Sequence, residues 1–228
     1  MHLLIASSAL WVALHIGLAG TALRGAVAGR IGEQGFRGLF SAASIAVFAL
    51  LVYAFIHAPR TPLWVAPEGL RWGLAALMLP AAFLLLGSLF TISIKPEDAG
   101  TRRDGTRGVL RLTRHPMLCA FALWAALHII GTGELAATVF FGAFLVTAAA
   151  GMPSIDAKYA RRNPGAWQRF AAATSILPGA AILAGRNRLV WSEIGWLLPL
   201  ASLALWATLL LLHQKMTGVA PVPLPWAS

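Results

Sequence analysis

The chain has 228 residues, of which 58% are hydrophobic and only 11% are charged, whereas an average soluble domain has about 25% charged residues. Together with a mean hydropathy of +0.74, this composition excludes a disordered chain and an ordinary soluble domain. The single cysteine, Cys119, excludes a disulfide scaffold. The composition predicts an all-α fold that forms one integral membrane domain over residues 1–228.

Six apolar runs are long enough, or nearly so, to cross a bilayer as helices, which takes about 20 residues. They cover residues 2–23, 39–57, 71–94, 115–132, 134–152 and 190–213. Only a few residues separate the fourth run from the fifth, so these two helices must form an antiparallel hairpin. The sequence therefore predicts a bundle of about six transmembrane helices.

Residues 153–170 do not have the pattern of a span. Aromatic and polar residues are interspersed there, and Pro164 and Gly165 interrupt the helical pattern. This predicts an interfacial amphipathic helix that is broken at Pro164 and Gly165. The next residues, 171–185, are apolar but too few to cross, which predicts a re-entrant or surface-lying stretch.

The net charge of +10 arises from 18 Lys and Arg against 8 Asp and Glu. In a soluble protein this balance would suggest nucleic acid as a partner. Here the basic residues lie in short loops between apolar runs, so we expect no nucleic acid and a role for the lipid bilayer instead. Fifteen of the eighteen follow the first, third or fifth span. The positive-inside rule then predicts a multi-pass protein of the inner (cytoplasmic) membrane with both termini outside.

Four histidines lie inside the predicted spans or at their ends, where ionisable residues are costly and are therefore functional candidates. His15 lies within the first span, His57 ends the second, His115 opens the fourth and His128 lies near its far end. A neutral imidazole can ligate a metal, haem iron included, or relay protons. Structural roles are the alternative: an interfacial position for the last three, and a hydrogen bond to Ser8 for His15.

Membrane depth tests whether two of these histidines could share one haem iron. At a rise of about 1.5 Å per residue, His15 lies about 10–12 Å from the cytoplasmic end of its span, and His128 about 6 Å from the outer end of the fourth. In a hydrocarbon core of about 30 Å, this leaves a mismatch of roughly 10 Å or more. By depth alone, His57 is the better partner for His128, whereas His2 and His213 are expected at the interface.

A second candidate site precedes the fourth span, where Arg111, Arg114 and His115 are followed by Pro116. Proline is favoured in the first turn of a helix. Two guanidinium groups and an imidazole at a helix start could bind a carboxylate, a propionate or a phosphate. The alternative is the basic flank that any cytoplasmic helix end can have, and the residues alone leave both interpretations open.

Three stretches of the sequence form a recognisable pattern. They are LHIGLAGTALR (14–24) with RIGEQGFRGLFS (30–41), GVLRLTRHPMLCAFALWAALHII (108–130) and SIDAKYARRNPGAWQRFAAATSILP (154–178). The specific features are His-x-Gly-Leu-Ala in the first, and Arg-His-Pro with another His thirteen residues later in the second. The pattern resembles the NnrU-type membrane proteins, which include the 15-cis-zeta-carotene isomerases of plants and cyanobacteria. It covers most of residues 10–180, and the last span is not informative.

This resemblance implies an activity and a cofactor. Bacterial members are associated with denitrification, in nitrite and nitric oxide metabolism. The isomerase members bind haem b through histidines and use it to isomerise a double bond. The isomerases carry a cysteine three residues before the second-motif histidine, and this chain has Ala125 there, so a thiolate ligand at that place is absent.

The resemblance also implies roles for individual residues. His15 matches the histidine of the first motif and His128 the one that closes the second, so both are expected as metal ligands and catalytic residues. His57 and His115 match further histidines of the isomerases, His57 as a substitute ligand and His115 as another catalytic candidate. The residues that would pair with the haem propionates are Arg111 and Arg114.

Two other functions remain open from the sequence. Arg-His-Pro at the start of a span, a hairpin and a polar-aromatic segment also resemble the isoprenylcysteine carboxyl methyltransferases, which bind S-adenosylmethionine. The residues that would line such a pocket are Arg114, His115, Asp156, Tyr159 and Trp167. The third possibility is a non-catalytic assembly factor for a denitrification enzyme. The first prediction is an NnrU-like haem-b protein with a lipophilic or small-molecule substrate and denitrification enzymes as candidate partners.

Overall fold

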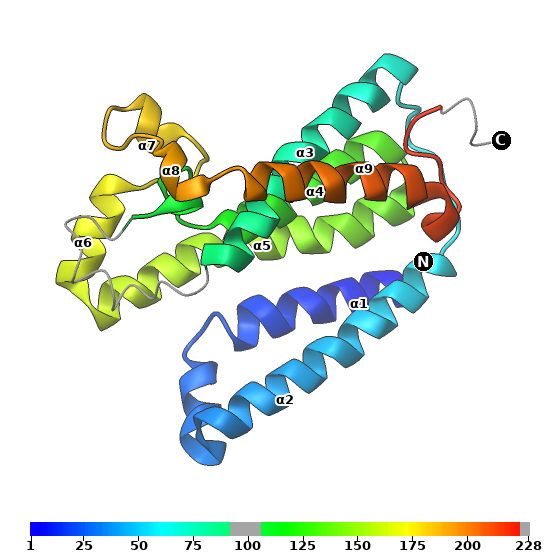
Figure 1. The fold of residues 1–228 in the computed structure, drawn as a ribbon. Coiled ribbons are helices and arrows are strands. Elements are labelled where there is room, and N and C mark those ends of the chain that lie inside the picture. Colours follow the sequence, from blue (N-terminus) through cyan, green and yellow to red (C-terminus); the bar gives the residue numbers. More distant parts are fainter. Residues whose placement is uncertain (92–105, 224–228) are drawn as a thin grey trace.

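The computed structural model describes residues 1–91 and 106–223 and is almost entirely helical there (Figure 1). Its elements are α1 (His2–Val12), the π-helix η1 (Ala13–Leu18), α2 (Leu23–Ile56), α3 (Glu68–Thr91), the 3-10 helix η3 (Gly108–Arg111), α4 (Pro116–Thr132), α5 (Leu135–Arg162), α6 (Pro164–Ala173), α7 (Ala180–Leu183), α8 (Trp191–Ile194) and α9 (Leu197–Thr217). Within the described residues, an isolated bridge between Pro62 and Glu134 is the only β-type pairing. The all-α fold is confirmed.

The helices account for the six predicted spans. Four of them, α2, α3, α5 and α9, are long and apolar enough to cross a membrane, while α4 and the combined α1 and η1 are shorter apolar helices. In α2 and α9 only 11% of the most apolar stretch is buried, against 44% in α5. α5 therefore lies at the centre of the bundle. Because lipid is as apolar as a leucine side chain, the unburied apolar residues of α2 and α9 can face lipid without cost.

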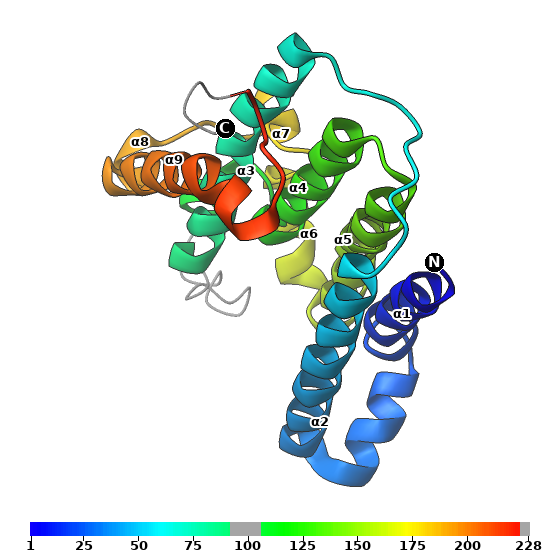
Figure 2. The same ribbon diagram turned by 90° about the vertical axis from the view of Figure 1, so that its right-hand side faces the viewer.

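The helices are arranged around an antiparallel hairpin of α4 and α5. α3 packs on α4, α9 packs on α3, and α1 packs on both α5 and α2. Figures 1 and 2 show α1 and α2 side by side, with α9 on the far side of the bundle. The N-terminus and the last described residues lie at the same end (Figure 1). Both ends of the described chain on one side agree with an even number of membrane crossings. Which side of the membrane they occupy stays a prediction.

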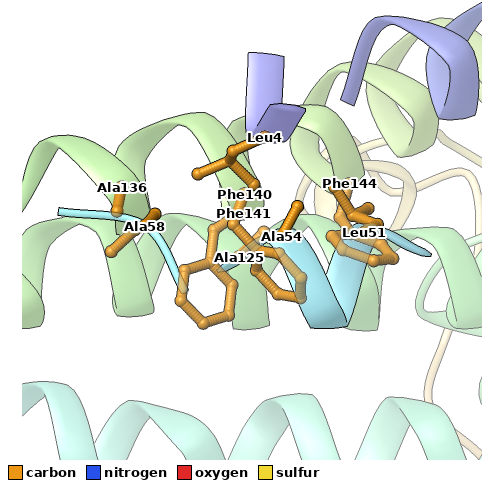
Figure 3. Close-up of a cluster of buried hydrophobic side chains, with 10 residues drawn as sticks. Leu4, Leu51, Ala54, Ala58, Ala125, Ala136, Phe140, Phe141 and Phe144 are labelled. Atoms are coloured by element: carbon orange, nitrogen blue, oxygen red, sulfur yellow. The ribbon is translucent and has the colours of Figure 1, made fainter. Parts of the chain in front are cut away.

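A core of ten buried side chains joins α1, α2, α4 and α5 (Figure 3). Ala125 and Ala136 are fully buried, and their small size lets α4 and α5 approach closely. Phenylalanines from α5 fill the remaining space. The members are Leu4, Leu51, Ala54, Ala58, Ala125, Ala136, Ala137, Phe140, Phe141 and Phe144. Ala125, at the position where the resemblance would place a cysteine, is therefore a packing residue.

The turn between α4 and α5 is held by the segment that connects α2 to α3. Gly133 has φ +63°, and a Cβ there would lie 2.1 Å from the Trp64 carbonyl oxygen, so only glycine fits. The Leu63 amide donates to the Gly133 carbonyl at 2.7 Å, and the Trp64 indole Nε1 donates to the Ile130 carbonyl at 2.9 Å. The predicted hairpin is confirmed, and these bonds fix the end of α4 that carries His128.

The predicted interfacial helix over residues 153–170 is wrong in its first half. Residues 153–162 continue α5, and the helix is interrupted at Asn163, directly before the predicted break at Pro164 and Gly165. The Asn163 side chain accepts a hydrogen bond from the Ala166 amide at 3.2 Å and caps α6. Pro164 takes the first position of α6, where its missing N–H costs nothing.

The last predicted span, 190–213, begins later than expected. α8 ends at Ile194, and Gly195, with φ +67°, interrupts the helix. α9 then begins as a separate helix at Leu197, seven residues after the predicted start. The stretch 171–185 does not cross. It turns after α6, and its Gly179 amide donates to the Leu112 carbonyl at 2.8 Å, so it is docked against the chain that precedes α4.

Candidate functional site

Three of the helical histidines share one local arrangement. In each, the ring Nδ1 is bonded to the backbone carbonyl four residues earlier, which belongs to an aromatic residue. The pairs are His15 with Trp11 at 3.0 Å, His57 with Tyr53 at 2.8 Å and His128 with Trp124 at 2.8 Å. Because a carbonyl oxygen only accepts, Nδ1 carries the proton, and the neutral ring presents Nε2 as a lone pair. Metal-ligating histidines have this same arrangement.

His15 lies in the π-helix η1, an irregularity that is often found at functional sites. The Ala19 amide donates to the Leu14 carbonyl at 3.2 Å, which is the wider π-type bond. The His15 ring packs 4.0 Å from the Trp11 ring and 5.3 Å from that of Phe40. The buried Trp11 Nε1 has no hydrogen-bond partner among the described residues, which is a costly state for an indole N–H.

His128 lies near the end of α4 among aromatic rings. Its ring stacks on Phe141 of α5 at 4.5 Å and lies 5.1 Å from Trp124. The ring of His213, on α9, lies 6.1 Å away at an interplanar angle of 26°. The sequence predicted His213 only as an interfacial residue, because nothing in one sequence indicates which faces of α4 and α9 meet.

The two histidines that the resemblance assigns to one haem, His15 and His128, are not ring neighbours in the described structure. Trp11 beside His15 and Trp124 beside His128 both contact Phe144, at 5.0 and 5.5 Å, so aromatic side chains lie between them. His57 directly follows α2 and is exposed. That these histidines ligate a metal stays a prediction for all three.

His115 differs from the other histidines because its partner is a carboxylate. It is buried at the N-cap of α4, and its Nε2 lies 2.7 Å from the Asp156 Oδ1. The Arg114 Nε and Nη2 donate to the Asp156 Oδ2 at 2.9 and 2.7 Å, and the guanidinium lies over the Trp167 ring at 5.4 Å. Burial lowers the pKa of His115, and the charge of Asp156 opposes this shift.

Arg111 is also paired. Its Nε and Nη2 donate to the two Glu193 carboxylate oxygens at 2.8 and 2.9 Å, and its Nη1 donates to the Asn187 Oδ1 at 2.9 Å. The Gly108 amide donates to the same carboxylate at 2.8 Å. These hydrogen bonds, those from Arg111 first, lower the pKa of Glu193. Glu193 is a partner that the sequence analysis missed.

The arginines lie at the opposite end of α4 from His128. Fourteen residues separate Arg114 from His128, which is about 20 Å along a helix. Arg111 and Arg114 are already bonded to Glu193 and Asp156, and neither is placed beside the His128 ring. Their expected pairing with haem propionates has no support from this geometry and stays a prediction.

Comparison with known proteins identifies the family. The family model described as NnrU protein matches residues 3–221, nearly the whole chain. The chain belongs to the NnrU family. The match includes α9 and therefore extends beyond residues 10–180, where the sequence motifs are recognisable.

Two curated relatives agree with membership of the NnrU family. The chain is similar to a protein named 15-cis-zeta-carotene isomerase, chloroplastic, from Arabidopsis thaliana, with 26% identity over 215 residues that cover 91% of this chain and 58% of the relative. The protein of the same name from Zea mays is 25% identical over 166 residues, covering 70% of this chain and 45% of the relative. The chain thus matches only about half the length of each relative. No solved structure matches it.

Proposed function

We propose that this NnrU-family protein binds haem b and isomerises a double bond of a lipophilic substrate. One observation carries the proposal: the helical imidazoles of His15 and His128 donate their Nδ1 protons to backbone carbonyls and present Nε2 as a ligand. The names of the relatives supply the reaction class. A role in denitrification or nitric oxide metabolism stays a prediction of the resemblance.

The residues around these imidazoles fit a large, flat, apolar group. His128 is flanked by Trp124 and Phe141, and His15 by Trp11 and Phe40. The buried and unpartnered Trp11 Nε1–H is a donor that a bound polar atom would satisfy. Neutral nitrogen donors in aromatic surroundings fit haem iron, for which histidine is a usual axial ligand.

Haem iron bound there would supply a Lewis-acid or one-electron centre. The protein residues have separate tasks. The Trp124 carbonyl fixes the tautomer and orientation of the His128 ring, and the neighbouring rings of Trp124 and Phe141 shield it from water. Since α2 and α9 are mostly unburied, a lipophilic substrate would reach the protein from the lipid.

The test is the spectrum of the protein purified in mild detergent from haem-supplemented cells. We expect stoichiometric b-type bands in the reduced-minus-oxidised spectrum, and their loss in His128→Ala. His2→Ala is the matched control, because His2 is exposed at the start of α1 and should retain the bands. A well-folded wild-type protein without haem would contradict the proposal. Retention of haem with an unchanged spectrum in His57→Ala would show that His57 is no ligand.

The methyltransferase alternative has weaker support. The structure does gather Arg114, His115, Asp156 and Trp167 at one end of the bundle. However, Asp156 already bonds to both Arg114 and His115, so the cluster satisfies its own polar groups instead of presenting them to a cofactor. Calorimetry with S-adenosylmethionine tests this alternative, and heat of binding that disappears in Asp156→Asn would favour it.

A further inference from the structure

Two buried polar side-chain atoms, one on α1 and one on α2, have no hydrogen-bond partner among the described residues. They are the Trp11 Nε1 and the Ser44 Oγ. Two other indoles of the chain, those of Trp64 and Trp206, donate to backbone carbonyls at 2.9 and 2.6 Å. A buried donor without an acceptor is costly, so this pair of atoms requires an explanation.

The Ser44 hydroxyl differs from the other buried serine hydroxyls inside the described helices. Those of Ser7, Ser88 and Ser202 each donate to a carbonyl three or four residues earlier, at 3.1, 2.6 and 2.7 Å. This bond to the same helix is the usual way in which a helical serine is satisfied. Ser44 does not make it, and its hydroxyl therefore stays available to a group outside α2.

Ser44 lies on the face of α2 that α1 covers. The Phe40 ring, one turn before Ser44, lies 5.3 Å from the His15 ring. The Phe48 ring, one turn after Ser44, lies 6.0 Å from the Trp11 ring. Residues four apart share one side of a helix, so Ser44 faces the part of α1 between Trp11 and His15. Figure 2 shows α1 and α2 side by side along this stretch.

The surroundings favour a neutral, flat ligand. Phe144 of α5 packs 5.0 Å from the Trp11 ring, so the neighbouring side chains are largely aromatic. One turn before the Phe40 position, Arg24 lies over the Phe36 ring and is already paired with Glu33. An anion would therefore lose its hydration here without gaining a free counter-ion. An indole N–H and a hydroxyl together suit a carbonyl oxygen, which has two lone pairs and no hydrogen of its own.

We propose that Trp11 and Ser44 bind one carbonyl oxygen of a flat, lipophilic ketone or quinone between α1 and α2. Both side chains donate to that oxygen, and the aromatic rings enclose the ring that carries it. The inference goes beyond the proposed function and does not depend on it, because neither side chain is a metal ligand and His15 keeps its Nε2. Since α2 is mostly unburied, such a molecule would reach the site from the lipid.

The test uses the full chain in mild detergent with 2,3-dimethyl-1,4-naphthoquinone as the probe. The methyl groups block the ring carbons that could otherwise alkylate the Cys119 thiol. The control probe is 2,3-dimethylnaphthalene, which has the same ring system without oxygen. We expect calorimetry to detect binding of the quinone and not of the hydrocarbon. With ¹³C in both carbonyls, the infrared band of the bound quinone should split, because only one of the two oxygens accepts hydrogen bonds.

Variants that remove one donor at a time test the two residues separately. Trp11→Phe and Ser44→Ala should each weaken binding of the quinone roughly 2- to 10-fold, the effect of one hydrogen bond. The double variant should lose the infrared splitting, and its loss of affinity should differ from the sum of the single losses because both residues bind one atom. Ser202→Ala is the matched control, since that buried hydroxyl is bonded within α9, and it should bind the quinone like the wild type.

The ligand-free protein provides a second measurement, which also shows that the variants fold. Ser44→Ala removes a buried hydroxyl that has no partner, so its unfolding temperature should equal or exceed that of the wild type. Ser202→Ala removes a bonded hydroxyl, and its unfolding temperature should be lower.

Three results would overturn the proposed carbonyl site. Equal binding of the quinone and the hydrocarbon, with an unsplit infrared band, would mean that no carbonyl is recognised. An unfolding temperature as low in Ser44→Ala as in Ser202→Ala would show that the Ser44 hydroxyl already has a partner, such as an ordered water. Loss of the haem bands in Trp11→Phe, with unchanged quinone binding, would assign the indole to haem. A wild-type protein that binds the quinone and no haem would instead overturn the proposed function alone.

Discussion

The two ends of α4 carry histidines in opposite circumstances. At the N-cap, His115 is bonded through Nε2 to Asp156, which also binds Arg114. These three side chains therefore satisfy one another's hydrogen bonds. Near the other end, His128 is bonded through Nδ1 to its own helix, and its Nε2 has no hydrogen-bond partner among the described residues. The surroundings there are aromatic, with His213 as the only titratable ring neighbour found in the described chain.

This difference shows that burial of a histidine does not by itself indicate its role. The informative property is which ring nitrogen is already used. A carboxylate on Nε2 makes His115 part of a structural charge cluster. A carbonyl on Nδ1 leaves His128 with an oriented ligand nitrogen. Changes at the His115 end should therefore affect stability, and changes at the His128 end should affect binding.

The largest expected effect is that of Asp156→Ala. It leaves Arg114 and His115 without their carboxylate in a site where the Asp156 side chain is only 12% exposed. Removal of one partner of a buried ion pair costs about 3–5 kcal/mol. The single cysteine, Cys119, is buried, so a thiol-reactive fluorophore in detergent reports unfolding. We expect a clearly lower unfolding temperature, with haem per folded molecule unchanged.

Glu134→Ala is the matched control for that experiment. Glu134 pairs with Arg60 at 2.9 Å, but the Arg60 side chain is 48% exposed, and such a pair contributes about 0–1 kcal/mol. If Asp156→Ala and Glu134→Ala lower the unfolding temperature equally, the buried cluster around His115 stabilises the fold no more than an exposed ion pair does.

Glu193→Gln should have an intermediate effect at the same end of the molecule. It weakens the two bonds from Arg111 and the bond from the Gly108 amide. The Glu193 side chain is 20% exposed, so water screens the pair in part and the expected loss is about 1–2 kcal/mol. The same thiol assay measures it, and a loss as large as that of Asp156→Ala would contradict this ranking.

Acidification should lower the stability of the folded protein in two stages, one from His115 and one from Glu193. The folded-state pKa of His115 is below its ordinary 6.5 and that of Glu193 is below its ordinary 4.5, so the unfolded chain binds more protons in both ranges. The stability from His115 is present above pH 6.5 and declines below it, and that from Glu193 declines below pH 4.5 as the pH falls through the folded pKa. In a plot of unfolding temperature against pH, His115→Gln should remove the first stage, and Glu193→Gln should remove the second. A profile unchanged in both variants would contradict the assignment.

Much of the fold follows from the sequence because lipid imposes a simple rule. Each span must be an apolar helix that satisfies its own backbone, so the six runs and the hairpin could be predicted. The errors lie at the interface, where that rule ends. Residues 153–162 are polar enough to suggest a separate helix, yet they continue α5, because a helix can extend beyond the bilayer without penalty.

The site could be predicted only in part. The motifs identified His15, His115 and His128, but helix rotation decides which of their neighbours meet, and sequence periodicity does not fix the rotation of a uniformly apolar helix such as α9. That is why His213 was placed at the interface. Asp156 was recognised as a candidate, whereas its bonds to the residues before α4 depend on the docking of α5 beside them.

The smallest expected effect separates two ways of holding the His213 ring. Thr217→Val removes the hydroxyl 3.1 Å from the His213 Nδ1 and leaves the Val219 carbonyl at 2.8 Å in place. If the carbonyl sets the tautomer, the variant loses less than about 1 kcal/mol of stability in the thiol assay. Thr147→Val is the matched control, since the Thr147 hydroxyl also donates to the carbonyl four residues earlier but lies in the middle of α5. A loss clearly larger than about 1 kcal/mol in Thr217→Val alone would mean that the hydroxyl, and not the carbonyl, is the main bond that holds the ring.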